Sequence, residues 1–545
     1  MRRFHLSGRE IPIWLRCGAL AAAVLLVVLL TIRVVEREAG VSVQIARSPA
    51  FLDPARISSF EEKLVCGALY ESLVEYDPVK NRCKGVLAAS WKEDAGGTIY
   101  TFILRKGVRF HNGKPLTARD VKYSWERVMN PRLSSYGYLL QNVEGADEVI
   151  SGKRRTAAGL VVVDDRTVRV FLKEPDLTFP AVVSSPVLAV VNRELAEKWG
   201  DRYGEQGTPV SGTGPFYLAR WNDGEILLSK NRRHKTAAAS LNSLAFVTTG
   251  STQEARRFFA SGRVDILTGV PSRFAGELAG DKAVLVKKPV LSFYFLGFNM
   301  GQEPFGRKVD LRRGIDRAID KERLTALLLG ESGRPLERLL PPELGGGENS
   351  PRREGSGRQE ALRFLAEAGH PYGFNLPLLS FAFNDTPGHE LLGRLIQEEL
   401  DKVGVEVDLK KRPWKEYLRE LRQGEHSFFR LGWEADYPEA GNILACNFAG
   451  WERKRNNLTE YGNGRFDSLI KEARKERHLS RRREIYRQAE ELILADLPVI
   501  PLFQKVAVFV VRKGITGFQV DPLGRIDFGS LGRAGELQRR SASTP

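Results

Sequence analysis

The chain has 545 residues, which is too long for one compact core and indicates roughly three or four structural units. A hydrophobic share of 42% and a charged share of 28% are typical of a folded globular protein, and they exclude a chain that is disordered throughout. The net charge of +16 comes from basic residues spread among acidic ones, without a basic arm or an RNA-binding motif, and this argues against a nucleic-acid partner.

The N-terminal segment combines positive charge with an apolar run. Residues 1–16 hold four arginines and one glutamate, and residues 17–35 begin with CGALAAAVLLVVLLTI. This order is that of an export signal, and no cleavage site of small residues follows it. We therefore expect a cytoplasmic segment at 1–16 and an uncleaved signal anchor, a transmembrane helix, at 17–35. The rest of the chain would lie on the periplasmic face of a bacterial cytoplasmic membrane. A cleaved signal that releases the chain into the periplasm is the alternative.

The four cysteines are too few and too scattered for a metal framework, and we predict no metal and no cofactor. Cys17 precedes the apolar run, whereas a lipid-attachment cysteine follows one. Cys66 and Cys83 are close in sequence and would meet an oxidising compartment. They are candidates for a disulfide, although the sequence does not test their geometry.

The first part of the chain after the apolar run reads as strands and helices. Residues 41–45 predict a strand, and residues 60–73 carry apolar side chains at helical spacing. Residues 98–104 alternate and lead through a turn into 108–110, which predicts a hairpin. Thr-Ala-Arg-Asp at 117–120 is a capping box, and it predicts that a helix begins there.

Further along, residues 160–163 and 168–172 predict a second hairpin. The glycine-rich turn SGTGP at 211–215 precedes a strand and not a helix, which argues against a phosphate loop. The later half alternates helices with strands, which predicts an α/β arrangement. The expected helices are 312–329, 359–368, 390–403, 466–474 and 481–494, and the expected strands are 376–383, 405–409, 428–433 and 506–511. Residues 531–545 are polar and predict a disordered tail.

Five blocks, in this order, resemble family 5 of the solute-binding proteins of ABC importers, the oligopeptide-, dipeptide- and nickel-binding group. They are LAASWKEDAGGTIYTFILRKGVRFHNGKPLTARDVKYSW at 87–125, SGTGPFYLARWNDGEILLSKN at 211–231, the region of 296–323 with GFNMGQEPFGR and with AIDKERL, which ends at 324, RLGWEADYPEAGNIL at 430–444 and FDSLIKEA at 466–473. The resemblance runs from about residue 41 to about residue 529.

The resemblance implies a two-lobed, mixed α/β fold of the periplasmic binding protein-like II class, cluster C type, with an extra small N-terminal subdomain. Lobe I would comprise 41–289 and 503–530, with the extra subdomain at about 80–210. Lobe II would comprise 290–502. A ligand would lie between the lobes and stabilise their closure.

The resemblance also implies roles for residues in the fourth block. The aspartate that accepts the α-ammonium of a peptide in the family corresponds to Asp436. Trp433 would line a side-chain pocket with Tyr437 beside it. Arg430 matches an arginine that can receive a peptide carboxylate through two parallel hydrogen bonds.

Two residues of the expected ligand site depart from the family. Ser58 stands where several oligopeptide binders carry an acidic residue, and Glu434 stands where small or sulfur-bearing residues are usual. These departures indicate a ligand that differs from a generic peptide, and Glu434 would favour a cationic one.

The resemblance implies an extracytoplasmic binding protein, a monomer, that captures peptides and delivers them to the permease subunits of an ABC importer. We predict no catalytic residues and no enzymatic activity, because no nucleophile-and-base or metal motif occurs in a convincing setting. Two alternatives remain: a membrane-tethered ligand sensor or accessory protein that uses the same fold, and a binder of a non-peptide solute such as a metal chelate.

Overall fold

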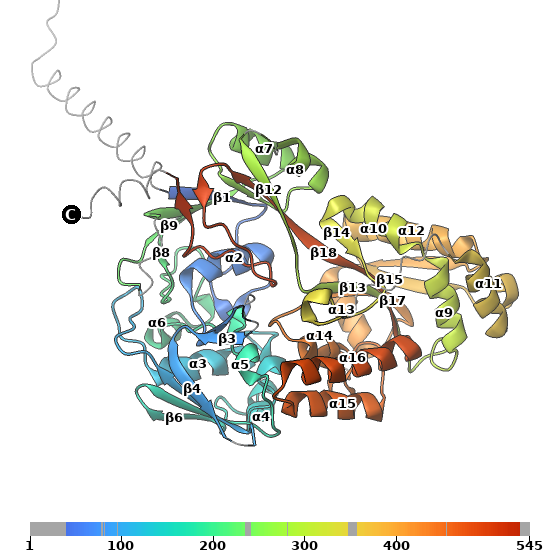
Figure 1. The fold of residues 1–545 in the computed structure, drawn as a ribbon, viewed down its shortest axis with the longest axis horizontal. Coiled ribbons are helices and arrows are strands. Elements are labelled where there is room, and N and C mark those ends of the chain that lie inside the picture. Colours follow the sequence, from blue (N-terminus) through green and yellow to red (C-terminus); the bar gives the residue numbers. More distant parts are fainter. Residues whose placement is uncertain are drawn as a thin grey trace, which may run out of the picture.

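The computed structural model describes residues 40–534 except 78–79, 81, 95, 235–240, 279, 281, 347–356 and 454. These residues form two lobes joined by crossing strands (Figure 1). The predicted segments 1–16 and 17–35 lie outside the described residues. Within the described part, no helix has both the length and the hydropathy that crossing a membrane requires.

The lobes share one sheet, which has twelve strands among the described residues. Ten follow in the order β16-β15-β17-β13-β18-β11-β1-β10-β9-β8, and β12 and β14 also pair with β18. We call the part around β1–β12 the N-lobe and the part around β13–β17 with α9–α16 the C-lobe. In Figure 1 most of the N-lobe is blue to green, with the C-terminal part of the chain added in red, and the C-lobe is mostly yellow to orange-red.

Strand β18 (Val499–Arg512) belongs to both lobes. Residues 499–503 pair with β13 (Ser292–Phe298) of the C-lobe. Residues 506–512 pair with β12 (Ala283–Pro289) of the N-lobe. The predicted lobe limits stay predictions: the first, 289/290, separates β12 from β13, and the second, 502/503, falls inside β18.

The N-lobe contains a second, antiparallel sheet in the order β4-β5-β7-β6. Strand β5 (Ile99–Leu104) alternates between partly and fully buried residues, as its sequence predicts. The expected hairpin of 98–104 with 108–110 is wrong, because β5 pairs with β4 and β7 and Arg109 instead bridges to Pro115. The hairpin of β6 and β7 and the capping box of α3 are confirmed: Asp120 accepts from the Thr117 amide at 2.9 Å and its hydroxyl at 2.7 Å.

The remaining elements of the N-lobe surround these sheets. Its strands and helices are β1 (Gly40–Ile45), α2 (Phe60–Leu69), β2 (Val74–Asp77), β3 (Arg82–Gly85), β4 (Ala88–Glu93), α3 (Ala118–Met129), α4 (Ala146–Ile150), β6 (Leu160–Asp164), β7 (Thr167–Phe171), α5 (Phe179–Val182), α6 (Arg193–Trp199), β8 (Phe216–Asn222), β9 (Glu225–Lys230), β10 (Ser243–Thr248), α7 (Thr252–Ala260), β11 (Ile266–Thr268), α8 (Ser272–Leu278), β19 (Ile515–Thr516) and β20 (Gly532–Arg533).

The C-lobe buries both faces of its sheet. Alternate residues of β13 point to opposite faces: Phe293 and Phe295 belong to the core shared with α14–α16, and Phe298 belongs to the core shared with α9 and α12. The predicted helix 312–329 is two helices, because the chain leaves helical geometry at Ile319 and Asp320 caps a new helix.

From β14 to β17 the elements of the C-lobe alternate between strands and helices, whereas α9 with α10 and α14 with α15 and α16 follow one another without a strand between them. Besides β13 the elements of the C-lobe are α9 (Val309–Ala318), α10 (Lys321–Leu329), β14 (Gly333–Pro335), α11 (Arg358–Glu367), β15 (Leu379–Asn384), α12 (Pro387–Asp401), β16 (Val407–Arg412), α13 (Trp414–Gln423), β17 (Phe428–Glu434), α14 (Ala440–Phe448), α15 (Gly464–Lys475) and α16 (Leu479–Asp496).

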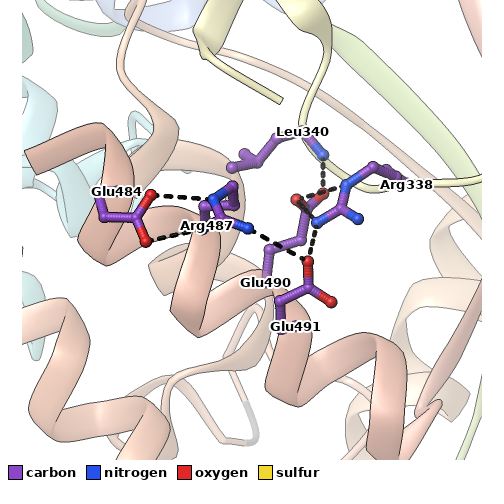
Figure 2. A network of polar contacts seen from close by, with 6 residues as sticks. All are labelled: Arg338, Leu340, Glu484, Arg487, Glu490 and Glu491. Carbon is purple, nitrogen blue, oxygen red and sulfur yellow. Dashed lines mark hydrogen bonds and ion pairs between the residues drawn. The ribbon is translucent and has the colours of Figure 1, made fainter. Parts of the chain in front are cut away.

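A polar network attaches the segment after β14 to α16 (Figure 2). The fully buried carboxylate of Glu490 accepts from Arg338 Nε at 3.0 Å, from Arg338 Nη2 at 2.7 Å and from the Leu340 amide at 2.7 Å. Because a buried charge needs a partner, this cation fixes the segment to the helix. Arg487, one turn earlier on α16, pairs with Glu484 (Figure 2).

Two expectations need correction. Cys66 and Cys83 are free thiols, so the candidate disulfide between them is not formed. The two side chains face different surroundings: burial, then Asp53, raises the pKa of Cys66, whereas burial and Glu439 of the C-lobe raise the pKa of Cys83 to about 12. The predicted disordered tail also begins too early, because Leu531 is fully buried and β20 pairs with β19. Residues 535–545 lie outside the described part.

Candidate ligand site between the lobes

Asp436 lies just beyond the end of β17, where the two lobes meet. Tyr138, in the short helix η2 (Gly137–Leu140) of the N-lobe, donates its hydroxyl hydrogen to Asp436 Oδ2. On the C-lobe side, the Asp436 amide donates to Asn442 Oδ1 at 3.1 Å, and Asn442 Nδ2 lies 3.5 Å from Asp436 Oδ2. The carboxylate is therefore held by neutral groups from both lobes.

The surroundings of Asp436 disfavour its negative charge. Burial raises its pKa, and the Tyr138 hydrogen bond, the charge of Lys63 and Asn442 only partly oppose this effect. Among the described residues, none forms an ion pair with Asp436. A desolvated carboxylate without a cation is unfavourable, so a cation supplied by a ligand would bind favourably here.

Trp433 and Tyr437 lie on either side of Asp436 in sequence but have different roles. The Trp433 ring lies 6.0 Å from that of Tyr138, and its indole nitrogen donates to Asn442 Oδ1 at 3.0 Å. Tyr437 is 7% exposed and packs into the core of the N-lobe. Trp433 thus lies beside the carboxylate, whereas Tyr437 is buried where one lobe packs against the other.

Arg430 is a buried cation without an acidic partner among the described residues. Its side chain donates from Nη1 to Asn384 Oδ1 at 2.9 Å, and its Nε has no acceptor. The residue is 6% exposed, and burial lowers the pKa of its guanidinium. A guanidinium has five N–H donors, so most of its capacity to bind an anion is unused.

Glu434 already has a cationic partner. Lys505 Nζ lies 2.8 Å from Glu434 Oε1, and the Tyr294 hydroxyl donates to the same oxygen at 3.2 Å. Burial raises the pKa of Glu434, but Lys505, Lys63 and Tyr294 outweigh it and lower the pKa to about 2. The preference for a cationic ligand that we expected from Glu434 stays a prediction, and this ion pair opposes it.

The alternation of β17 divides the site into two groups. Arg430, Gly432 and Glu434 share one face of the sheet, and Trp433 points to the other. The ring of Tyr294 lies across Gly432, where an added Cβ would meet ring atoms at 2.5 Å. Glycine at this position therefore makes room for the ring that separates Arg430 from Glu434.

Ser58 lies at the start of α2 and is occupied by a local contact. Its amide and its hydroxyl donate to Glu62 Oε2 at 2.7 Å and 3.0 Å. These bonds help to begin the helix, as capping interactions do. Its role in ligand binding stays a prediction.

A row of basic side chains at the end of α15 joins the C-lobe to acidic residues of the N-lobe. The Leu177 amide also donates to the Arg474 carbonyl at 2.7 Å. The ion pairs are Lys471 with Glu174 at 2.8 Å, Arg474 with Asp176 at 4.0 Å, and Arg477 with Glu93. The lobes therefore meet through opposite charges at this place as well as through Tyr138 and Asp436.

Sequence reasoning missed Tyr138, Asn442, Tyr294 and Lys505. Asn442 lies in the first turn of α14 and inside the 430–444 block, so the block that contains Asp436 also contains it. Tyr138 is 298 residues from Asp436 in the chain, and no local pattern links them.

Comparison with known proteins supports the assignment of the fold. Residues 82–453 match the family model of bacterial extracellular solute-binding proteins, family 5 Middle. The chain is 26% identical to the dipeptide-binding protein DppE of Bacillus subtilis, over 83% of this chain and 87% of that protein. It is 28% identical to the periplasmic oligopeptide-binding protein OppA of Salmonella typhimurium, over 87% of this chain and 89% of that protein. The solved structure of Haemophilus influenzae OppA in complex with RPPGFSPFR matches with a TM-score of 0.73 at 24% identity, covering 91% of this chain and 99% of that one.

Proposed function

Because the chain belongs to the bacterial extracellular solute-binding proteins of family 5, we propose that it captures peptides outside the cytoplasm and delivers them to the permease of an ABC importer. Relatives named for dipeptide and oligopeptide binding match it over more than four fifths of its length, at 83% and 87%. The proposal includes no catalytic step, and the chain would act as a monomer.

The observation that carries the peptide assignment is the state of Asp436. Its carboxylate is desolvated, its protein partners are neutral, and Tyr138 reaches it from the opposite lobe. The α-ammonium of a peptide would supply the missing positive charge, and groups from both lobes would surround it. Binding would therefore favour the closed arrangement over the open one, as differential affinity requires.

Arg430 would receive the carboxylate at the other end of the peptide. Arg430 is buried and lies on β17, the strand that ends just before Asp436, and its Nε lacks an acceptor. The main chain of the ligand would form hydrogen bonds with the same end of β17. Hydrated contacts would tolerate different side chains of the ligand.

We also infer from the sequence that residues 17–35 tether the chain to the membrane. The mass of the mature protein tests this point. A chain that begins near residue 40 would show a cleaved signal and exclude the tether.

The experiment for the peptide assignment uses Asp436→Asn and one peptide in two forms. The variant should weaken binding of the peptide with a free amino terminus roughly a hundredfold or more, because a buried ion pair loses one partner. It should change binding of the acetylated peptide little. Equal losses would remove the ammonium from Asp436, and mass spectrometry of co-purified ligand that finds a metal chelate or a bile acid and no peptide would refute the assignment.

A further inference from the structure

Tyr294 lies between two cations on the face of the sheet that carries Arg430. The Arg430 Cζ lies 5.4 Å from the centre of the ring, and Lys505 Nζ lies 4.8 Å from the same centre. The ring also stacks on that of Phe503, at 5.0 Å between centroids. One aromatic platform therefore fixes the positions of both cationic groups.

The separation of the two cations has an upper limit set by this shared ring. Since each lies within about 5.5 Å of one centre, one small molecule can contact both. The two carboxylates of a single C-terminal glutamate or aspartate lie closer together than this upper limit, so each could reach one of the cations through a hydrogen bond. The α-carboxylate would bind one cation and the side-chain carboxylate the other.

Lys505 has room for a further acceptor despite its ion pair. An ammonium group has three N–H donors. In the structure one of them reaches Glu434 Oε1 at 2.8 Å, and a second interacts with Tyr294. The Lys505 side chain is 42% accessible, so the third donor can meet a ligand without breaking the existing pair.

The balance of charge at this face also favours an acidic group. Arg430 has no acidic partner among the described residues, and Lys505 has Glu434. Lys63, on α2 of the N-lobe, adds a third positive charge that acts on Glu434. Lys63 acts on Asp436 as well, so three cations face two protein carboxylates, Glu434 and Asp436. A peptide that brings one ammonium and two carboxylates would balance these charges.

We infer that this protein selects peptides whose C-terminal residue is acidic, with Arg430 and Lys505 as the two anion-binding groups and Glu434 as the residue that holds Lys505 in place. The inference rests on the proposed peptide-binding function. The charge of Glu434 alone predicted that it attracts a cationic ligand. In this inference Glu434 instead positions Lys505, a cation of the protein.

The test compares matched peptides that differ only at the last residue. Titration calorimetry with Ala-Ala-Glu, Ala-Ala-Gln and Ala-Ala-Lys, and with two- to five-residue members of each series, measures the preference directly. The glutamate-ending peptide should bind roughly ten- to a hundredfold tighter than the glutamine-ending one, the gain typical of a charge-assisted hydrogen bond. The lysine-ending peptide should bind weakest.

Two variants locate the preference. Lys505→Met should reduce the ratio of glutamate to glutamine affinity to about one. Glu434→Gln should lower the ratio by a smaller factor, because Lys505 keeps its charge but loses the carboxylate that positions it; an unchanged or higher ratio would refute the positioning role of Glu434. Lys287→Met is the matched control. It removes a lysine of β12 that pairs with Glu331 at 2.8 Å and does not contact Tyr294, so the ratio of affinities should not change.

The outcomes separate this inference from the proposed function. Equal affinities for the three endings in the wild-type protein would overturn the inference while leaving peptide binding in place. A preference for the lysine ending would overturn it in favour of a cation-binding Glu434. Failure of every peptide to bind would overturn both.

Discussion

Replacing Lys471 and Arg477 together by glutamine removes two ion pairs that join the lobes, and it should make the closed arrangement less stable. Lys471 pairs with Glu174 at 2.8 Å, and Arg477 pairs with Glu93. Neither side chain contacts Asp436, Arg430 or Glu434 in the structure. The perturbation therefore changes the equilibrium between lobes and leaves the proposed ligand contacts in place.

The size of the effect follows from the exposure of the two pairs. The side chains are 44% and 49% accessible in the first pair and 55% and 26% in the second, so solvent screens both. Exposed pairs contribute roughly 0.2–1 kcal/mol each, and the two together roughly 0.4–2 kcal/mol. Since a ligand must draw the chain into the closed state, its apparent affinity should fall by roughly two- to thirtyfold.

Calorimetry and small-angle scattering test this prediction together. The variant should bind peptide more weakly at low salt, and the wild-type protein should approach it at high salt, where the pairs are screened. The radius of gyration of the ligand-free variant should be larger. Arg487→Gln is the control, because it removes one positive charge from a pair with Glu484 inside one helix, where no contact between the lobes is lost (Figure 2). Unchanged affinity, salt dependence and size in the double variant would refute the reasoning, since the pairs would then stay together in the open state.

Three further predictions concern the site and the core. As the pH is lowered from 7, peptide affinity should begin to fall at a pH above the ordinary pKa of an aspartate. Burial raises the pKa of Asp436, and its protonated form cannot pair with an ammonium. The affinity of an acetylated peptide should not change over the same range. Gly432→Ala should displace the Tyr294 ring, which an added Cβ would meet at 2.5 Å, and weaken binding roughly tenfold or more by calorimetry while the protein stays folded by circular dichroism. Arg127→Met should destabilise the N-lobe by about 3–5 kcal/mol in urea unfolding. In the wild-type protein Arg127 Nη2 lies 2.6 Å from the fully buried Asp53 carboxylate, which the variant would leave without a cation. A loss below about 1 kcal/mol would show that Asp53 gains another partner or a proton.

Local signals in the sequence predicted the local structure where the contacts lie within a few residues, but not the partners of β5, which pairs with β4 and β7. The capping box at Thr117 and the turn between β6 and β7 depend on contacts within a few residues, and both are confirmed. The helix expected at 312–329 shows the limit of periodicity, because the apolar spacing continues through the break at Ile319 while the Asp320 cap begins a new helix.

The candidate site was predictable only where one block of sequence contains it. The block at 430–444 holds Asp436, Trp433 and Arg430, and their positions follow from one strand and the turn after it. Tyr138 and Lys505 come from distant segments, 298 residues from Asp436 and 71 residues from Glu434, and only the folded chain brings them together. The expected disulfide failed for the opposite reason: Cys66 and Cys83 are close in sequence but lie in different surroundings.

The strand β18 constrains how this chain reaches its folded state. Residues 499–503 complete the C-lobe sheet and residues 506–512 pair with the N-lobe, so neither lobe has all its strands until almost the last part of the chain is synthesised. The sheet that the two lobes share therefore cannot be completed until nearly the whole polypeptide has been synthesised, whereas the antiparallel sheet of β4–β7 has all its strands by Phe171. A truncation before β18 would leave both lobes incomplete.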